Sequence, residues 1–124
     1  MFKQLCFFRK RPDMTIEEFM DYYENQHSQL SKKMGLKPSI PNATRYVRRY
    51  LKPEKNPVTG EVHDSGYDCL MEIWWNSRED FEFSRAQLDL MKRDGKFVLV
   101  VEYLSNAAKI EDAVRIVGPL GYTL

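Results

Sequence analysis

The sequence is poor in cysteine and has no long run of apolar residues. Its 124 residues include two cysteines, Cys6 and Cys69, each inside a short apolar segment. One isolated pair is not the dense framework of a small disulfide-stabilised domain, and its spacing lacks the local pairing of zinc-ligand motifs. We therefore expect two buried free thiols. No stretch is long enough for a membrane span or a signal peptide, so we expect no membrane association and, by default, a cytoplasmic protein.

An excess of charge of one sign is also missing. The 19 basic and 18 acidic residues are interspersed, so the net charge is +1 and the isoelectric point is about 7.7. Nucleic-acid-binding domains usually carry a basic face, and the short clusters at 9–11 and 48–49 do not make one. The sequence also lacks a phosphate-binding glycine loop, a nucleophile elbow and a paired-cysteine metal motif. We expect neither a nucleic-acid partner nor a bound metal.

The length and a hydrophobic content of 43% fit one globular domain, residues 1–124. Thr15 followed by Glu18, and Ser77 followed by Asp80, each have the spacing of a helix-capping box. Strands are predicted by runs of apolar and aromatic residues at 2–9, 43–51, 66–75 and 113–118. The order β-α-β-β-α-(α)-β predicts an α+β fold, an antiparallel sheet with two helices on one face. The other face would be apolar, so we expect a second copy to cover it in a homodimer.

Two segments are ambiguous. Residues 52–65 contain prolines, a glycine and several charges, and they predict a long exposed connection that either moves or covers a pocket. Residues 95–108 combine the composition of a strand with spacing that a helix would also satisfy. Their structure is left open by the residues alone.

The segment YYENQH, residues 22–27, has a histidine where helical spacing calls for an apolar residue. Spacings of three and four define the inward stripe of the first predicted helix: Ile16, Phe19, Met20, Tyr23, His27 and Leu30. His27 is therefore expected to face the interior, where an imidazole costs free energy unless it is hydrogen-bonded. One interpretation is a core histidine satisfied by backbone or a carboxylate. The other is a group that takes and gives a proton near neutral pH.

The third predicted strand carries Asp68, Glu72 and Trp74 on one face, because alternate side chains of a strand point the same way. If that face meets the helix, Glu72 can accept a hydrogen bond from His27 and raise its basicity. Otherwise the two carboxylates lie at a rim or pair with arginines of the second predicted strand. Trp74 and Trp75 point in opposite directions, so we expect one in a helix-side cavity and the other at the dimer interface.

Three segments in combination resemble the EthD family of the dimeric α+β barrel (ferredoxin-like) superfamily. RKRPDMTIEEFMDYYENQH, residues 9–27, is similar to the family's proline turn, capped helix and helix-borne histidine. ATRYVRRY, residues 43–50, resembles its strand of alternating aromatic and basic residues. GYDCLMEIWWNSREDF, residues 66–81, resembles its Asp-x-x-x-Glu-x-Trp strand, which runs into the second helix.

The resemblance implies a βαββαβ chain with a four-stranded antiparallel sheet, and a homodimer with a cavity between helices and sheet in each subunit. It also implies that VVEYLSNAAK, residues 100–109, is an extra helical segment before the last strand. The chemistry it implies uses neither a metal nor an organic cofactor: decarboxylation, dehydration, cyclisation or isomerisation, often on aromatic polyketides or related rings.

Together these observations predict a cofactor-independent lyase or isomerase that binds a small aromatic or unsaturated carbonyl compound beneath the first helix. His27 is the candidate general acid/base and Glu72 its partner. Tyr46 and Arg9 are expected to donate to the developing oxyanion. The side chains expected to bind substrate are Tyr46, Trp74, Arg9, Tyr23, Tyr103 and Asp68, although packing alone would also explain each tyrosine.

Two other functions remain open at this stage. The same superfamily includes cofactor-free oxygenases and haem proteins, and in the haem version His27 would be the axial ligand. The second is a non-enzymatic accessory protein that binds a small molecule without converting it.

Overall fold

The computed structural model describes residues 1–29, 40–94 and 104–119. Their main elements are strands β1 (Phe2–Phe8), β2 (Arg45–Tyr50), β5 (Cys69–Trp75) and β6 (Val114–Gly118), and helices α1 (Ile16–Tyr22) and α3 (Arg78–Arg93). The four strands form one antiparallel sheet in the order β2-β5-β1-β6. This is the ferredoxin-like arrangement that the sequence predicted.

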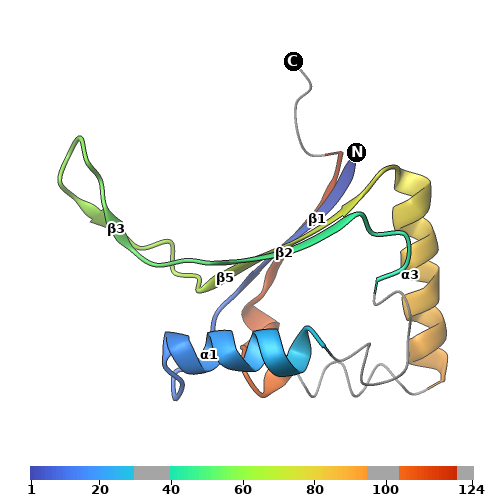
Figure 1. Cartoon of the computed structure of the whole chain (residues 1–124), viewed down its shortest axis with the longest axis horizontal. Helices are drawn as coiled ribbons and strands as arrows, with labels where there is room; N and C mark the ends of the chain where they lie inside the picture. Colours follow the sequence, from blue (N-terminus) through green and yellow to red (C-terminus); the bar gives the residue numbers. More distant parts are fainter. Residues whose placement is uncertain (30–39, 95–103, 120–124) are drawn as a thin grey trace.

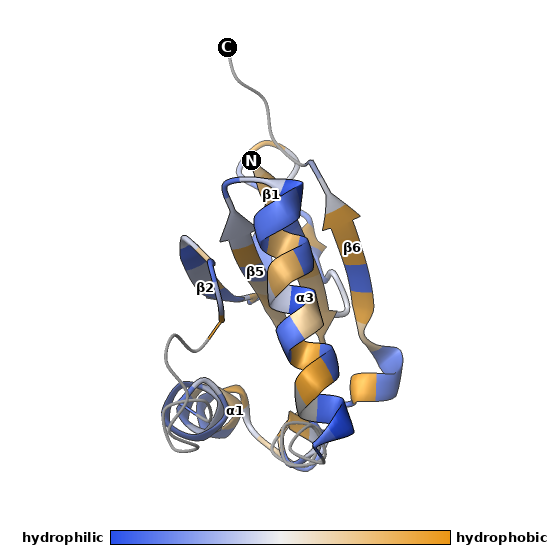
Figure 2. Ribbon diagram, turned by 90° about the vertical axis from the view of Figure 1, so that its right-hand side faces the viewer, coloured by the Kyte–Doolittle hydropathy of each residue, from blue (hydrophilic) through white to orange (hydrophobic). Residues whose placement is uncertain are grey.

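Both long helices lie on the same side of the sheet (Figure 1), and α3 crosses in front of it in the perpendicular view (Figure 2). The core fills the space between these two layers. It consists of Phe2, Cys6 and Phe8 of β1, Cys69, Met71, Ile73 and Trp75 of β5, and Phe19, Tyr23, Phe81, Ala107 and Ala108. The two cysteines are fully buried and free, as expected.

Both helices begin where the capping pattern predicted. The Thr15 hydroxyl accepts a hydrogen bond from the Glu18 amide at 3.1 Å, and the Ser77 hydroxyl accepts one from the Asp80 amide at 3.1 Å. Each cap satisfies an amide that has no partner within its helix, which is typically worth about 1 kcal/mol. The caps therefore fix where α1 and α3 start relative to the strands that precede them.

We call the sheet face turned away from the helices the open face. By strand alternation and register it carries Lys3, Leu5, Phe7, Arg45, Val47, Arg49, Leu70, Glu72, Trp74, Val114 and Ile116. Val114 and Ile116 are 42% and 44% exposed. The open face is thus a mixture of apolar and basic side chains with no layer of the described chain packed over it (Figure 1).

The two ambiguous segments have different outcomes. Residues 52–65 form an exposed hairpin of β3 (Glu54–Lys55) and β4 (Val62–His63) that extends beyond the sheet (Figure 1). Residues 95–103, and with them Tyr103, lie outside the described residues. The chain is helical at Leu104 and Ser105 and forms a 3-10 turn, η2 (Ile110–Asp112), before β6. Among the described residues, no helix has the length and apolar character needed to cross a membrane.

Candidate functional site

Helix α1 does not end as an α-helix: it continues into a single π-helical turn, η1 (Tyr23–His27). The Ser28 amide donates to the Tyr23 carbonyl at 2.8 Å, the wider hydrogen bond of a π turn. Such turns are rare and are frequently found at functional sites. This one sets the His27 ring edge-on against Tyr23, with ring centroids 5.0 Å apart. The inward orientation predicted for His27 is confirmed.

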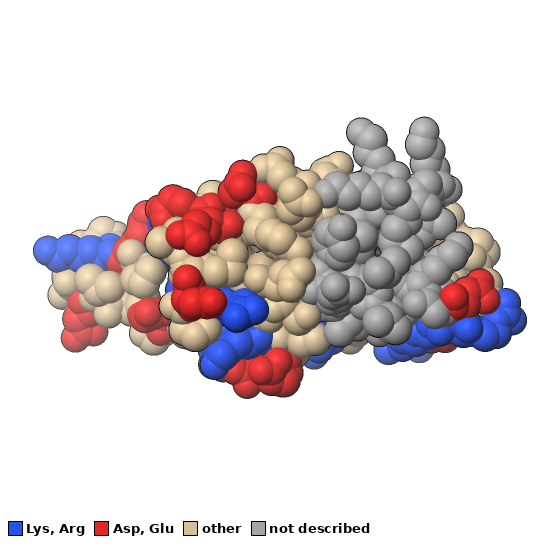
Figure 3. Space-filling model, turned by 90° about the horizontal axis from the view of Figure 1, so that it is seen from below, with Lys and Arg blue, Asp and Glu red and all other residues tan. Residues whose placement is uncertain are grey.

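The outer surface of α1 is acidic. Glu17 and Glu18 lie in its first turn and Asp21 follows, and Figure 3 shows acidic side chains gathered over this part of the molecule. These carboxylates are solvated and lie away from the sheet. The side of α1 available for binding a ligand in the interior is therefore the stripe that carries Tyr23 and His27.

The imidazole of His27 is desolvated, and one of its nitrogens lacks a hydrogen-bond partner among the described residues. Its Nδ1 atom is buried and has no hydrogen-bond partner among the described residues. Burial lowers the pKa of His27 to about 4, and the positive charge of nearby Arg48 contributes in the same direction. The ring is therefore uncharged at neutral pH, and its Nδ1 atom is left without a partner by the part of the chain that the structure describes.

The Tyr23 ring lies beside His27, and its hydroxyl meets that of a second phenol, Tyr46. The hydroxyls of Tyr23 and Tyr46 are 3.1 Å apart, within hydrogen-bond distance. Burial raises the pKa of both tyrosines. Both therefore remain neutral hydroxyls, so that one can donate to the other and still leave a hydroxyl group for a ligand oxygen.

A third group, not foreseen as part of the site, links η1 to β2. Arg48 donates to Glu24 through Nε and Nη2 at 2.8 and 2.7 Å, and the Tyr50 hydroxyl donates to the same carboxylate at 2.7 Å. The Arg48 guanidinium also lies 4.6 Å from the centroid of the Tyr46 ring. The hydrogen bond from Arg48 lowers the pKa of Glu24, and the carboxylate in turn raises that of Arg48.

Comparison with models of known protein families gives a match. The model of the EthD domain matches residues 11–96, more than half of the chain. The chain belongs to the EthD domain family. No curated protein matches it.

Three solved structures share the fold. An ethyl tert-butyl ether D family protein from Bacillus halodurans C-125 is 16% identical, with a TM-score of 0.57 over 98% of this chain and 100% of its own. An Arabidopsis thaliana protein is 11% identical, with a TM-score of 0.58 over 100% of both chains. HapK from Hahella chejuensis is 14% identical, with a TM-score of 0.51 over 100% of this chain and 99% of its own. At these identities the likeness concerns the fold.

In this EthD domain, Glu72 does not orient His27. The Glu72 carboxylate, 9% exposed, accepts a hydrogen bond from Arg49 Nε at 2.6 Å on the open face. The predicted hydrogen bond from His27 to Glu72 is therefore wrong, because the sheet itself separates Glu72 from α1. The alternative pairing with an arginine of the second strand is the one observed.

The adjacent tryptophans point in opposite directions, as predicted. Trp75 is 2% exposed in the core, and its Nε1 donates to the Pro41 carbonyl at 3.2 Å. Trp74 lies on the open face, between the Lys3 ammonium at 4.2 Å and the Arg45 guanidinium at 4.9 Å from its ring centroid. The prediction that Trp74 binds substrate beneath α1 is therefore wrong, because its side chain lies on the opposite face of the sheet.

Arg9 and Asp68 also lie away from His27. Arg9 Nε donates to the Gly66 carbonyl at 2.8 Å, and its guanidinium lies over the Tyr67 ring at 4.7 Å. Asp68 accepts from the Lys10 amide at 2.9 Å. Both side chains join the end of β1 to the segment that leads into β5. The predicted roles of Arg9 as an oxyanion donor beside His27, and of Asp68 as a substrate ligand there, do not fit this placement.

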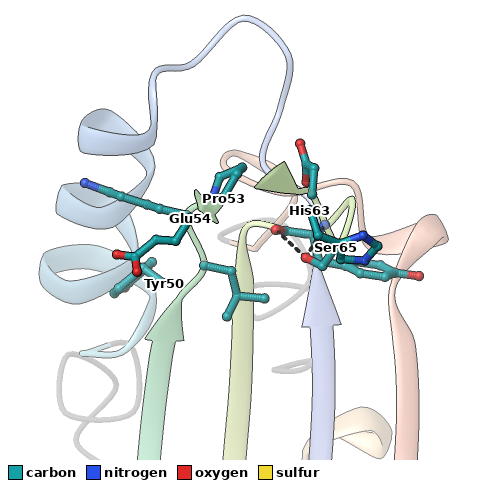
Figure 4. A pocket seen from close by; sticks show the side chains of 9 residues that line it. Tyr50, Pro53, Glu54, His63 and Ser65 are labelled. Carbon is teal, nitrogen blue, oxygen red and sulfur yellow. Dashed lines mark hydrogen bonds between the residues drawn. The ribbon is translucent and has the colours of Figure 1, made fainter. Parts of the chain in front are cut away.

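The base of the β3–β4 hairpin contains a recess of about 420 Å³. Figure 4 shows Tyr50, Pro53 and Glu54 on one side of it and His63 and Ser65 on the other. The remaining lining residues are Leu51, Lys52, Asp64 and Tyr67. His27 is not among them, although Tyr50 both lines the recess and donates to Glu24, and the predicted cavity beneath α1 stays a prediction. In the described ranges, no group of three or more His, Cys, Asp or Glu side chains is placed to hold a metal ion.

Proposed function

We propose that this EthD-family chain is a lyase or isomerase that moves a proton on a small aromatic or unsaturated carbonyl compound, with His27 as general acid/base. The main supporting observation is the buried Nδ1 of His27, which has no hydrogen-bond partner among the described residues. Leaving a buried polar atom unpaired costs about 1–3 kcal/mol, so each such atom calls for an explanation. A ligand group that occupies the site and bonds to this nitrogen would supply it.

The protonation states around His27 suit the first step of such a reaction. With a pKa of about 4, the imidazole is in its base form at neutral pH and can take a proton from a carbon next to a carbonyl. The phenol of Tyr46, kept neutral by burial, can donate a hydrogen bond to the carbonyl oxygen. Return of the proton to another carbon completes an isomerisation; its return to a departing hydroxyl, which leaves as water, completes a dehydration.

Solvent deuterium exchange tests this step before the natural substrate is known. Ring ketones and conjugated enones are incubated with the protein in D2O, and exchange of the proton next to the carbonyl is followed by NMR. His27→Gln should reduce the catalysed exchange rate at least on the order of 10²-fold, the usual scale for a lost proton-transfer group. His63→Gln is the matched control, because the chain has two histidines and His63 lies on the exposed hairpin.

Three outcomes separate the alternatives. Loss of exchange in His27→Gln alone supports the proposal. Equal exchange rates in the wild type and His27→Gln would reduce the histidine to a packing role. Tight binding of a test compound with no exchange, and no loss of binding in His27→Gln, would instead favour a small-molecule-binding accessory protein.

We also infer that the protein is a homodimer whose second copy packs against the open face. Trp74 supports this inference, because its Nε1 is buried without a hydrogen-bond partner among the described residues. An indole N–H usually finds an acceptor when it is buried. The exposed Val114 and Ile116 on the same face are apolar area that a second copy would remove from water.

A further inference from the structure

We propose that Arg48 holds the substrate oxygen that becomes negative when His27 removes a proton, and that Glu24 and Tyr50 are the residues that position it. This inference rests on the proposed function. It assigns to Arg48 the anion-binding role that the sequence suggested for Arg9, and it defines the ligand as a planar enolate-like or phenolate-like anion.

The Arg48 guanidinium is held in a fixed orientation. Arg48 is held at Nε and Nη2 by Glu24, and Glu24 is held by Tyr50 as well. Nη1 donates to no described residue, so one edge of the guanidinium is left for a ligand. A side chain fixed at two nitrogens, with a third available, is preorganised to bind an oxyanion.

The side chains of Arg48, Tyr46 and His27 come together between η1 and β2. Arg48 comes from the helix-side face of β2, stacks on Tyr46 and lies close enough to His27 for its charge to act on the imidazole. A base, a neutral phenol and a permanent cation therefore meet between η1 and β2. These are the groups that proton removal next to a carbonyl requires: one to take the proton and two to stabilise the oxygen.

The charge of Arg48 affects how readily His27 takes a proton. A cation beside a base opposes protonation of that base, so Arg48 by itself makes His27 a poorer proton acceptor. The repulsion between Arg48 and protonated His27 is offset when a negative oxygen forms between the two side chains, because the anion attracts both the guanidinium and the new imidazolium. The arrangement therefore favours a guest whose charge becomes negative at the moment His27 becomes positive.

The aromatic rings beside Arg48 and His27 favour a flat ligand. The Tyr23 ring lies against His27 and the Tyr46 ring under the Arg48 guanidinium; Tyr23 is buried and Tyr46 partly buried. Flat aromatic rings fit a planar conjugated system in which the negative charge is delocalised. A simple inorganic anion would use the guanidinium but not the rings.

A chromogenic phenol tests this assignment without any turnover. 4-Nitrophenol absorbs differently as phenol and as phenolate, so its ionisation can be read while it is bound. The wild-type protein should bind the phenolate at a pH below the free compound's own pKa. Arg48→Met should weaken phenolate binding on the order of 10²-fold, the scale seen when one oxyanion donor is removed.

Arg49→Met is the matched control. Arg49 is the next residue of β2, carries the same charge and lies on the open face, where it pairs with Glu72. Phenolate binding should be unchanged within about twofold in this variant. Equal weakening by the two substitutions would show a general effect of net charge and would overturn the assignment, as would wild-type binding in Arg48→Met.

Two further variants protect the test from misfolding and address the positioning roles. Glu24→Gln combined with Arg48→Met removes both charges, so the Glu24 carboxylate is not left without its guanidinium partner; it should bind phenolate as weakly as Arg48→Met. Tyr50→Phe should keep binding of neutral phenols while its bound nitrophenol ionises less readily than in the wild type. An unchanged absorption spectrum of the bound probe in Tyr50→Phe would remove Tyr50 from the proposal.

His27→Gln separates this inference from the proposed function. Phenolate binding that persists in His27→Gln, together with loss of deuterium exchange, supports both. Persistence of both phenolate binding and exchange would contradict the role of His27 and leave Arg48 as an anion-binding residue. Loss of phenolate binding in His27→Gln would mean that the imidazolium, and not Arg48, holds the anion.

Discussion

Arg48 and Arg49 are neighbours in the segment RYVRRY, yet they have very different surroundings. On the helix side, the Arg48 side chain is 20% exposed and gives two hydrogen bonds to Glu24. On the open face, the Arg49 side chain is 52% exposed and gives one to Glu72. The carboxylates show the opposite order, since the Glu24 side chain is 38% exposed and the Glu72 side chain 11%. The arginine is therefore the more buried partner on the helix side and the more exposed partner on the open face. The two arginines differ because the helices lie over the sheet face that carries Arg48, whereas Arg49 is on the open face.

Each face also has one buried side-chain nitrogen without a hydrogen-bond partner among the described residues: His27 Nδ1 on the helix side and Trp74 Nε1 on the open face. The two atoms differ in chemistry. An imidazole accepts or gives a proton, whereas an indole N–H only donates a hydrogen bond. This difference is why we propose a reactive role for the helix side and a docking role for the open face.

The two tryptophans give the largest expected contrast. Trp75→Ala should reduce the free energy of unfolding by about 3–5 kcal/mol, because it empties a core position packed on Phe81 and removes the hydrogen bond to Pro41. Trp74→Ala should cost less, and its cost should shrink as the protein is diluted, since in our proposal Trp74 packs against the second copy of the dimer. Urea unfolding at two protein concentrations measures both. A concentration-dependent loss in Trp75→Ala would contradict this division of the sheet.

The next contrast concerns the strand edge. Ile116 and Val117 are 44% and 40% exposed, and alternation along β6 places them on opposite faces, with Ile116 on the open face. Ile116→Lys should raise the dimer dissociation constant on the order of 100-fold, because it places a charge in an apolar contact. Val117→Lys is the control and should leave dimerisation unchanged. Light scattering after size exclusion reads the result, and a monomeric wild type would end the inference.

The sequence was sufficient for the local features of this fold. The caps at Thr15 and Ser77 and the inward orientation of His27 follow from hydrogen bonding and spacing within a few residues, and the structure confirms them. Leu30, the last member of the predicted stripe, lies outside the described residues. The combination of segments was also enough to identify the EthD family.

Features that depend on distant residues were not predictable in the same way. Alternation showed that Glu72 and Trp74 share a face, but both faces of β5 are apolar, so it did not show which one meets the helices. The Glu24–Arg48 pair joins residues 24 apart in the chain. Two local patterns could have pointed to this pair. Tyr46, Arg48 and Tyr50 stand at alternate positions of one strand, and the first helix carries a glutamate three residues before His27.

The pH dependence of the unfolding free energy tests whether burial lowers the pKa of His27. The pKa is about 4 in the folded state and 6.5 in the reference state, so between these values the unfolded chain binds the extra proton. Stability should therefore fall as the pH is lowered from about 6.5 to about 4, by roughly 2 kcal/mol and at most about 3. NMR titration of the two histidines should locate the folded-state pKa of His27 directly.

His27→Gln isolates this contribution. Because the pKa of Glu24 is lowered, loss of its ionised form also destabilises the protein at still lower pH, and the variant keeps that effect. The difference in unfolding free energy between the wild type and His27→Gln should vary with pH only in the window of His27. A difference that is constant from neutral pH to about 4 would show that the imidazole is not desolvated.

The smallest expected effect is on the open face, where Lys3 lies over Trp74 at 4.2 Å. A double-mutant cycle with Lys3→Met and Trp74→Leu should give a coupling free energy of about 0.5–1 kcal/mol, the range of an ammonium on a partly solvated ring. If a second copy covers this face, the ammonium loses water on association, and the coupling should be larger in the dimer than in the Ile116→Lys variant. Equal coupling in both would mean that this part of the open face stays in contact with water, and that the interface lies elsewhere on it.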